Sequence, residues 1–185
     1  MADTPWLFTQ NRHPTTDYIL IPRHSSGERR YIPMGFMSPN IISSDAVVLV
    51  DHATLYEFGI LSSNVHNAWM RTVCGRLKAD YRYAPSVYYN FPMPPQTQEM
   101  TELISKTAKG ILDARKLYPD KTLADMYGKQ MYLYPELVKA HQNNDRAVMN
   151  AYGFSVKDTS EADCVAELMK MYQKMVDTEK GGNTK

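Results

Sequence analysis

A cluster of prolines, Pro92-Met93-Pro94-Pro95, divides the chain into two parts with different hydrophobic periodicity. Before it, short β-branched and aromatic runs bounded by turn residues predict strands. After it, apolar residues recur about every 3.6 positions, which predicts helices. The sequence therefore predicts an α+β fold, with a β-rich unit containing inserted helices over 1–95 and an all-helical unit over 96–180. The polar, glycine-containing end, 181–185, is expected to be a disordered tail.

The first part contains several candidate strands. We expect strands at 18–22, 30–37, 46–50 and 87–91, where β-branched and aromatic residues concentrate. The polar segment His24–Gly27 separates the first two, so they are expected to form a hairpin.

Two helices are expected to interrupt these strands. Thr54 and Glu57 have the spacing of a capping box, which starts a short helix ending near residue 61. Ser63 is a candidate cap for a second helix, and Gly75 is expected to end it at the C′ position.

The second part predicts a helical bundle. Pro135 and Gly153 show the usual placement of proline at the start and glycine after the end of a helix. Helices are expected at 97–117, 122–128, 135–153 and 160–179.

Charged residues alternate in one stretch of the first part, at Lys78, Asp80 and Arg82. In a single strand, the two-residue period would place all three side chains on one face. Such a row suits the edges of DNA bases, because Lys and Arg donate to guanine and Asp accepts from cytosine. Lys78 and Asp80, about 7 Å apart along a strand, are predicted to read one G·C pair. The alternative is an exposed strand face with a cross-strand salt network.

The overall charge gives this interpretation no support. The 185 residues have a formal net charge of +1, with positive and negative side chains nearly balanced in both parts. A DNA reader of this kind would bind weakly alone and would depend on a partner domain to hold phosphates. Local clusters supply candidate phosphate contacts at Arg29, Arg30, Arg71 and Arg76, although each arginine is equally compatible with a solvated surface.

No catalytic, cofactor-binding or metal-binding motif is found. The glycines include no G-x-G or P-loop pattern, and the histidines include no H-x-x-x-H pair. Cys74 and Cys164 are far apart in sequence, which argues against a zinc site or disulfide scaffold and favours a reducing cytoplasm. We find neither a signal peptide nor an apolar run of about 18 residues, so the chain is expected to be soluble. A stand-alone hydrolase would need a cluster of titratable groups that the sequence does not offer.

Several stretches together resemble the MmeI-like (type IIL) restriction–modification enzymes, which are single-chain adenine-specific DNA methyltransferases. The most specific are the run Gly75–Tyr83 and the sequence Asn90-Phe91-Pro92-Met93-Pro94. The resemblance covers about residues 5–175. Its other segments are Trp6–Gln10, Ile21–Pro33, Asp51–Gly59, His66–Arg71, Leu123–Tyr127, Pro135–His141, Asp145–Val148 and Ala151–Gly153. Met93 stands where the family often has Trp, and Asn67 where it often has Met.

This resemblance implies a target recognition domain over 1–95, followed by a helical C-terminal domain. Residues equivalent to 78–82 would read base edges, with Arg23 and the region at Asp45 as further reading positions. The partners would be double-stranded DNA and the methyltransferase domain of the same polypeptide. That domain would bind S-adenosylmethionine and flip the target adenine, so no catalytic residue or cofactor is expected within this chain.

Two functions from different classes remain open at the level of sequence. The first is a non-catalytic module that recognises a DNA sequence for the parent enzyme. The second is a protein-interaction or structural helical module that makes no DNA contact. A DNA reader should gather Arg23, Arg71, Lys78 and Arg82 on one side of the molecule, whereas an interaction module would scatter them and expose an apolar patch.

Overall fold

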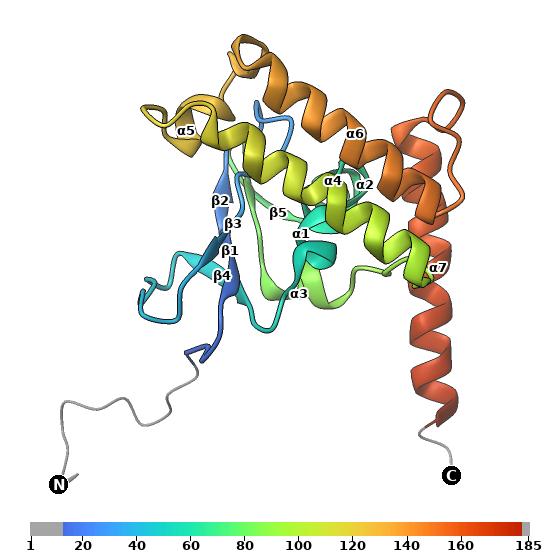
Figure 1. Ribbon diagram of the computed structural model, residues 1–185. Helices are drawn as coiled ribbons and strands as arrows, with labels where there is room; N and C mark the ends of the chain where they lie inside the picture. Colours follow the sequence, from blue (N-terminus) through green and yellow to red (C-terminus); the bar gives the residue numbers. More distant parts are fainter. Residues whose placement is uncertain (1–12, 183–185) are drawn as a thin grey trace, which may run out of the picture.

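The computed structural model describes residues 13–182, with side chains described as far as residue 180. It confirms the predicted α+β class, with small antiparallel sheets in the first part of the chain and helices in the second (Figure 1). The motif Trp6–Gln10 lies outside the described residues, as do residues 183–185 of the expected tail.

The first sheet has the strand order β3-β1-β4. Its strands are β1 (Tyr18–Pro22), β3 (Gly35–Met37) and β4 (Val47–Val50), and both pairings are antiparallel. The expected hairpin partner of β1 is therefore present, but only Gly35–Met37 of the predicted strand 30–37 is extended. Residues before Gly35 instead turn into the core, where Tyr31, Ile32 and Met34 are buried.

A second sheet, with the order β2-β6-β5, joins one strand to a hairpin that lies far from it in sequence. It combines β2 (His24–Ser25), β5 (Gly75–Leu77) and β6 (Asp80–Arg82). Arg23 connects the two sheets through its backbone, because its N–H donates to the Ala46 carbonyl at 3.0 Å and its carbonyl accepts from the Tyr83 N–H at 2.7 Å. The predicted turn at His24–Gly27 is thus partly a strand.

Both helices predicted within the first part are present. The capping box at Thr54 and Glu57 starts α1 (Leu55–Leu61), and Ser63 caps α2 (Asn64–Val73). The expected role of Gly75 is wrong, because this residue begins β5 and does not have a positive φ. Cys74, at the C-cap position, is already extended, so the helix passes directly into the strand.

The predicted strand at 87–91 is also wrong. Residues Pro85–Tyr89 form a short helix, α3, with Pro85 in the first turn, where its fixed φ suits a helix. Val87 is buried there, and its carbonyl accepts a hydrogen bond of 3.0 Å from Trp69 Nε1 of α2. This tertiary contact overrides the β propensity of the Val-Tyr-Tyr sequence.

The helical part follows the predicted periodicity closely. Gly153 has a φ of 73°, as expected for the glycine that ends a helix. The last helix continues to Gly182, two residues into the segment expected to be a tail. The elements are α4 (Gln98–Lys116), α5 (Leu123–Met126), the 3-10 helix η1 (Met131–Leu133), α6 (Pro135–Ala151) and α7 (Glu161–Gly182).

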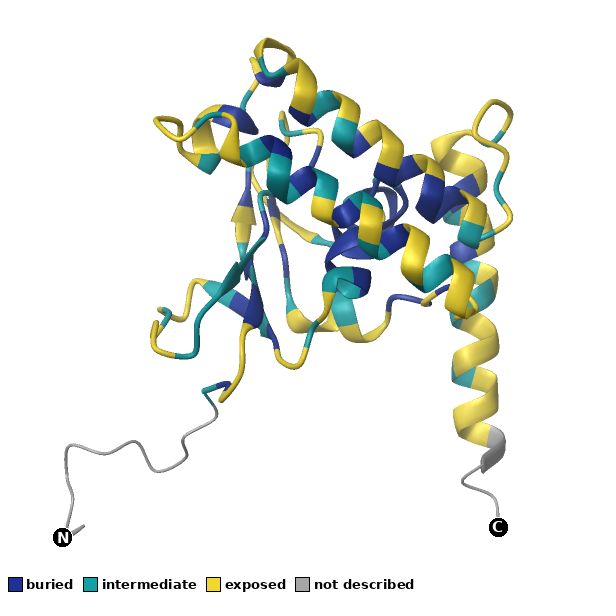
Figure 2. Ribbon diagram, viewed as in Figure 1, coloured by how far each residue is buried: buried dark blue, intermediate teal, exposed yellow. Residues whose placement is uncertain are grey.

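The two parts share one hydrophobic core (Figure 2). Gly59 of α1 packs directly against α4, and a Cβ at this position would lie 2.6 Å from Ile104 Cγ2. Asn144 of α6 joins all three helices, donating from Nδ2 to the Gly59 carbonyl at 2.7 Å and accepting from the Thr107 hydroxyl at 3.0 Å. A buried amide with both ends satisfied fixes the relative positions of these helices.

Asp145, the next residue of α6, connects the helical part to the loop before β3. Its carboxylate accepts a 2.6 Å hydrogen bond from the Tyr31 hydroxyl and a 2.8 Å bond from the Asn64 N–H at the start of α2. Burial raises the pKa of Asp145, although both hydrogen bonds favour the ionised form. Tyr31 also stacks on His141, with ring centroids 4.1 Å apart.

Two buried histidines are held in their neutral form. Burial lowers the pKa of His141 to about 3, with a smaller effect of the same sign from the nearby Arg115 cation. Burial likewise lowers the pKa of His66 to about 4. Their ring nitrogens form hydrogen bonds with the hydroxyls of Tyr127 at 2.7 Å and Tyr83 at 3.0 Å.

Replacing Tyr31 with Phe should lower the free energy of unfolding by about 1–3 kcal/mol, because the buried Asp145 carboxylate loses a donor. Chemical denaturation should still show a single transition, since both parts share the core. Tyr132→Phe is the matched control, because Tyr132 is 69% exposed and should tolerate the change. Equal effects of the two substitutions would contradict a special role for the Tyr31–Asp145 bond.

Stability should fall as the pH drops from about 6.5 towards 4.5. Over this range the unfolded chain protonates His66 and His141 while the folded chain does not, so protons favour unfolding by roughly 2 kcal/mol for each histidine. The raised pKa of Asp145 opposes part of this loss. In denaturation measurements across this range, the free energy of unfolding should depend less steeply on pH for His141→Gln, whereas His24→Gln, at the exposed position of β2, should retain the wild-type dependence.

Candidate nucleic-acid interface

The second sheet presents one face to solvent. Asp80 and Arg82 of β6 are exposed and flank the buried Tyr81, so these two charges share the outer face as predicted. Lys78 does not belong to that strand. It lies in the turn between β5 and β6, and the prediction that all three charges alternate along one strand is therefore wrong.

The tip of this hairpin has an unusual backbone. Lys78 has a φ of 58°, a left-handed conformation that is uncommon for residues other than glycine. Leu77 and Asp80 pair across the turn, so only Lys78 and Ala79 form the loop. A short turn of this kind reverses the chain where one continuous strand was expected, and it leaves Lys78 exposed at the end of the sheet.

Gly27 holds the hairpin tip in place. A Cβ on Gly27 would lie only 2.4 Å from the Ala79 carbonyl oxygen, so no larger residue fits without displacement. The Gly27 N–H also donates to Asp80 Oδ1 at 3.3 Å. Asp80 is therefore anchored through one carboxylate oxygen, and no hydrogen bond within the described chain is assigned to the other.

Cross-strand partners extend the exposed face beyond the predicted residues. His24 pairs with Arg82, and Leu77 pairs with Asp80, so both side chains lie on the same face as these charges. Gly75 lies opposite Arg82 on the other edge and leaves that position without a side chain. No sequence pattern pointed to His24, because β2 contains only two residues.

Arg23 and Asp45, which the sequence predicts as further reading positions, lie at the junction of the two sheets. Asp45 is exposed in the turn before β4, directly before Ala46, whose carbonyl accepts from the Arg23 N–H. The buried Nε of Arg23 has no hydrogen-bond partner among residues 13–182. The fold thus brings Arg23 and the Asp45 turn next to the end of β6, although these segments are distant in sequence.

The predicted phosphate contacts have different environments. Arg29 and Arg30 belong to the loop after β2, and the Arg30 guanidinium lies over the Tyr31 ring at 5.4 Å. Arg76 pairs with Tyr81 on the inner face of the sheet, where its guanidinium lies 4.5 Å from the Tyr81 ring centroid and donates to the hydroxyl at 3.2 Å.

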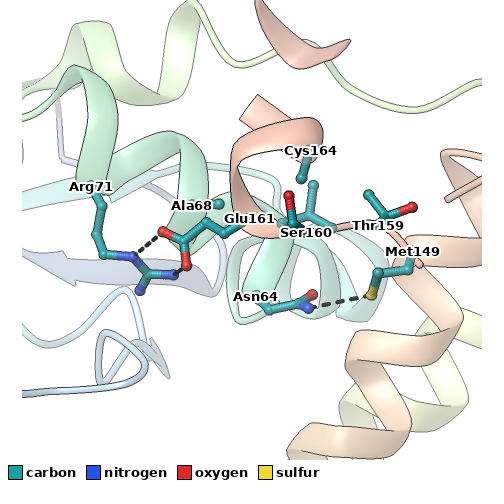
Figure 3. A pocket seen from close by; sticks show the side chains of 9 residues that line it. Asn64, Ala68, Arg71, Met149, Thr159, Ser160, Glu161 and Cys164 are labelled. Carbon is teal, nitrogen blue, oxygen red and sulfur yellow. Dashed lines mark hydrogen bonds and ion pairs between the residues drawn. The ribbon is translucent and has the colours of Figure 1, made fainter. Parts of the chain in front are cut away.

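Arg71 has a structural partner that the sequence did not reveal. Its guanidinium donates to both oxygens of Glu161 in α7, at 2.8 and 2.9 Å (Figure 3). This bidentate pair connects α2 to α7 and occupies the group expected to contact phosphate. Arg71 therefore does not join the other charges on the exposed sheet face.

The same region contains a small cavity of about 80 Å³, lined by Asn64, Met149 and Cys164 among others (Figure 3). Burial raises the pKa of the Cys164 thiol to about 11, which disfavours the reactive thiolate. Among residues 13–182, no group of three or more histidines, cysteines or acidic residues is placed to hold a metal ion. No helix within this range is long and apolar enough to cross a membrane.

Comparison with known sequences matches the chain to the MmeI target recognition domain over residues 1–95 and to the MmeI C-terminal domain over residues 93–179. The chain belongs to the MmeI family. DNA methyltransferase A of Bacillus subtilis (strain 168) is 37% identical to it over 179 residues, which are 96% of this chain and 20% of that protein.

A solved MmeI-family structure supports the same assignment. The type IIL restriction–modification enzyme MmeI, determined in complex with DNA, matches with a TM-score of 0.86 and 43% identity. The match covers 94% of this chain and 23% of the MmeI chain. The chain thus spans about one fifth to one quarter of the length of these relatives.

Replacing Gly27 with Ala should displace the hairpin tip, because the added methyl group meets a backbone oxygen. We expect a destabilisation of about 1–3 kcal/mol and faster amide exchange across residues 75–82. Gly35→Ala is the matched control, since nothing lies within 4 Å of a Cβ there. Unchanged exchange in the Gly27 variant would show that this loop does not hold the hairpin.

Proposed function

We propose that this chain is a DNA sequence-recognition module and that the exposed face of β2-β6-β5 reads the bases. The observation that carries the proposal is the grouping of Asp80, Arg82 and His24 on one solvent-facing surface, with Lys78 at its tip. This surface lies within the segment matched to the MmeI target recognition domain. MmeI itself has been determined in complex with DNA, which supports the same use of the fold here.

The hairpin has a suitable shape for this role. The major groove of B-DNA admits a two-stranded β-ribbon, and a narrow tip can enter it further than a flat sheet. Lys78 and Asp80 would read one G·C pair from this tip, the Lys donating to guanine and the Asp accepting from cytosine. Arg82, Arg23 and Asp45 would read neighbouring positions from the body of the sheet.

Phosphate contacts would position this reading surface without specifying sequence. Arg29 and Arg30 are candidates because their loop adjoins the hairpin tip through Gly27. Arg76 remains a candidate because it is exposed, although its guanidinium is bound to Tyr81. Arg71 is not part of the proposal, because Glu161 occupies its guanidinium.

The two parts of the chain would have different roles. Residues 1–95 would read DNA, while residues 96–180 would brace the reading sheet through the shared core. The parent enzyme would be a site-specific adenine-N6 DNA methyltransferase acting in the cytoplasm. Its S-adenosylmethionine would bind in a methyltransferase domain of the same polypeptide, and this chain would contribute no catalytic group.

Exchanging the two charges at the tip should change sequence preference at one base pair. In the double variant Lys78→Asp/Asp80→Lys, we expect lost or altered preference at a single G·C position, since each good base contact contributes about 1–3 kcal/mol of discrimination. The measurement is selection of bound sequences from random duplex DNA, using this chain alone and joined to its methyltransferase domain.

The matched control exchanges a similar exposed pair on α7, Glu167→Lys/Lys170→Glu. It should leave every position of the selected site unchanged. If the tip variant also selects an unchanged site, the assignment of Lys78 and Asp80 is wrong. If neither form of the wild-type chain enriches any sequence, the recognition proposal itself fails.

A further inference from the structure

Helix α6 has two faces with different environments. Leu137, His141, Asn144 and Val148 face the core and are fully buried. An adjacent face of the helix lines an open hollow of about 350 Å³. Its lining residues include Val138, Lys139 and Arg146, whose spacing places them along one side of the helix.

This hollow continues into a second one. The second hollow, of about 230 Å³, lies between the loop containing Glu28 and Arg30 and the segment at Lys129. Tyr132 and Val138 line both hollows, so the two hollows adjoin each other and are together called the α6 groove. The groove connects the helical part of the chain to the loop whose Gly27 contacts the hairpin tip.

The groove is positively charged, although the whole chain is nearly neutral. Four cationic side chains line the groove, together with one acidic side chain, Glu28. Glu28 is paired with Lys129 at 2.6 Å. The lining cations are Arg30, Lys129, Lys139 and Arg146.

Nearby acidic groups offset the charges of Lys139 and Arg146 only in part, the main contribution being the attraction between Asp145 and Arg146. Asp145 adjoins Arg146 in sequence, but its carboxylate is buried and accepts from Tyr31 and Asn64. Glu136, in the first turn of α6, is bound by the Tyr118 hydroxyl. Neither Lys139 nor Arg146 takes part in an ion pair with the described residues, and Arg146 donates to the neutral Asn143 side chain at 3.0 Å.

We infer that the α6 groove binds the phosphate backbone of the DNA whose bases the second sheet reads. This inference rests on the proposed function and extends the DNA contact to the helical C-terminal domain. Lys139 and Arg146 are seven residues apart on one helix, which separates them by roughly 10 Å along its axis. That spacing spans a few phosphates of one strand, and the groove ends beside the loop that supports the reading hairpin.

The test measures affinity for a random-sequence duplex as a function of salt concentration, using the full 185-residue chain. The variant Lys139→Gln/Arg146→Gln removes two cations while keeping long polar side chains. It should reduce the slope of log affinity against log salt by nearly 2, because each phosphate contact contributes about 0.9. Between 50 and 200 mM salt, wild-type affinity should then fall roughly ten-fold more than that of the variant.

Two controls isolate the groove. Lys157→Gln/Lys174→Gln removes the same charge from exposed sites in the loop before α7 and on α7, and it should retain the wild-type slope. Lys139→Arg/Arg146→Lys keeps both charges and should also retain it. Thermal unfolding of every variant verifies that the fold is unchanged.

The outcomes separate this inference from the proposed function. A reduced slope with an unchanged selected sequence supports phosphate binding in the groove. An unchanged slope, or no binding of the wild-type chain at 50 mM salt, overturns the inference and favours a protein partner for this surface. The effect of the Lys78/Asp80 exchange on sequence selection still decides the proposed function independently.

Discussion

The arrangement of this chain depends most on the hydrogen bonds that the buried carboxylate of Asp145 accepts. This carboxylate accepts hydrogen bonds from the hydroxyl of Tyr31, in the loop between β2 and β3, and from the first N–H of α2. A carboxylate removed from water is costly unless donors surround it, so these three segments are held in one geometry. The partial positive charge at the N-terminus of α2 also favours the ionised form.

This connection explains how helices distant from the exposed face of the second sheet hold that sheet in position. The loop between β2 and β3 is fastened at one end by Gly27 against the hairpin tip and at the other by Tyr31 and Met34 against the helices. Arg115 of α4 donates to the Met34 carbonyl at 2.8 Å and to the Tyr127 hydroxyl. A surface supported in this way is preorganised, so binding a ligand would order few additional groups.

The exposed charges of the second sheet are separate from this support. Asp80 and Arg82 alternate with the buried Tyr81, so the side chains that face solvent can differ while the packing residue stays the same. Lys78 contributes to the surface from a turn and has no role in the core. Substitutions at the outer positions should therefore have little effect on the free energy of unfolding.

Much of the fold follows from local sequence signals. The capping box at Thr54, the Pro135 and Gly153 helix boundaries and the 3.6-residue periodicity of the second part act over one or two turns, so the sequence alone determined these elements. The exposure of Asp80 and Arg82 around Tyr81 was also evident from alternation. Tertiary structure alone decided the hairpin turn at Lys78, the helix at Pro85–Tyr89, the pairing of His24 with Arg82 and the ion pair of Arg71 with Glu161. Each depends on partners distant in sequence, whose contacts can outweigh local propensities that differ by only about 1 kcal/mol.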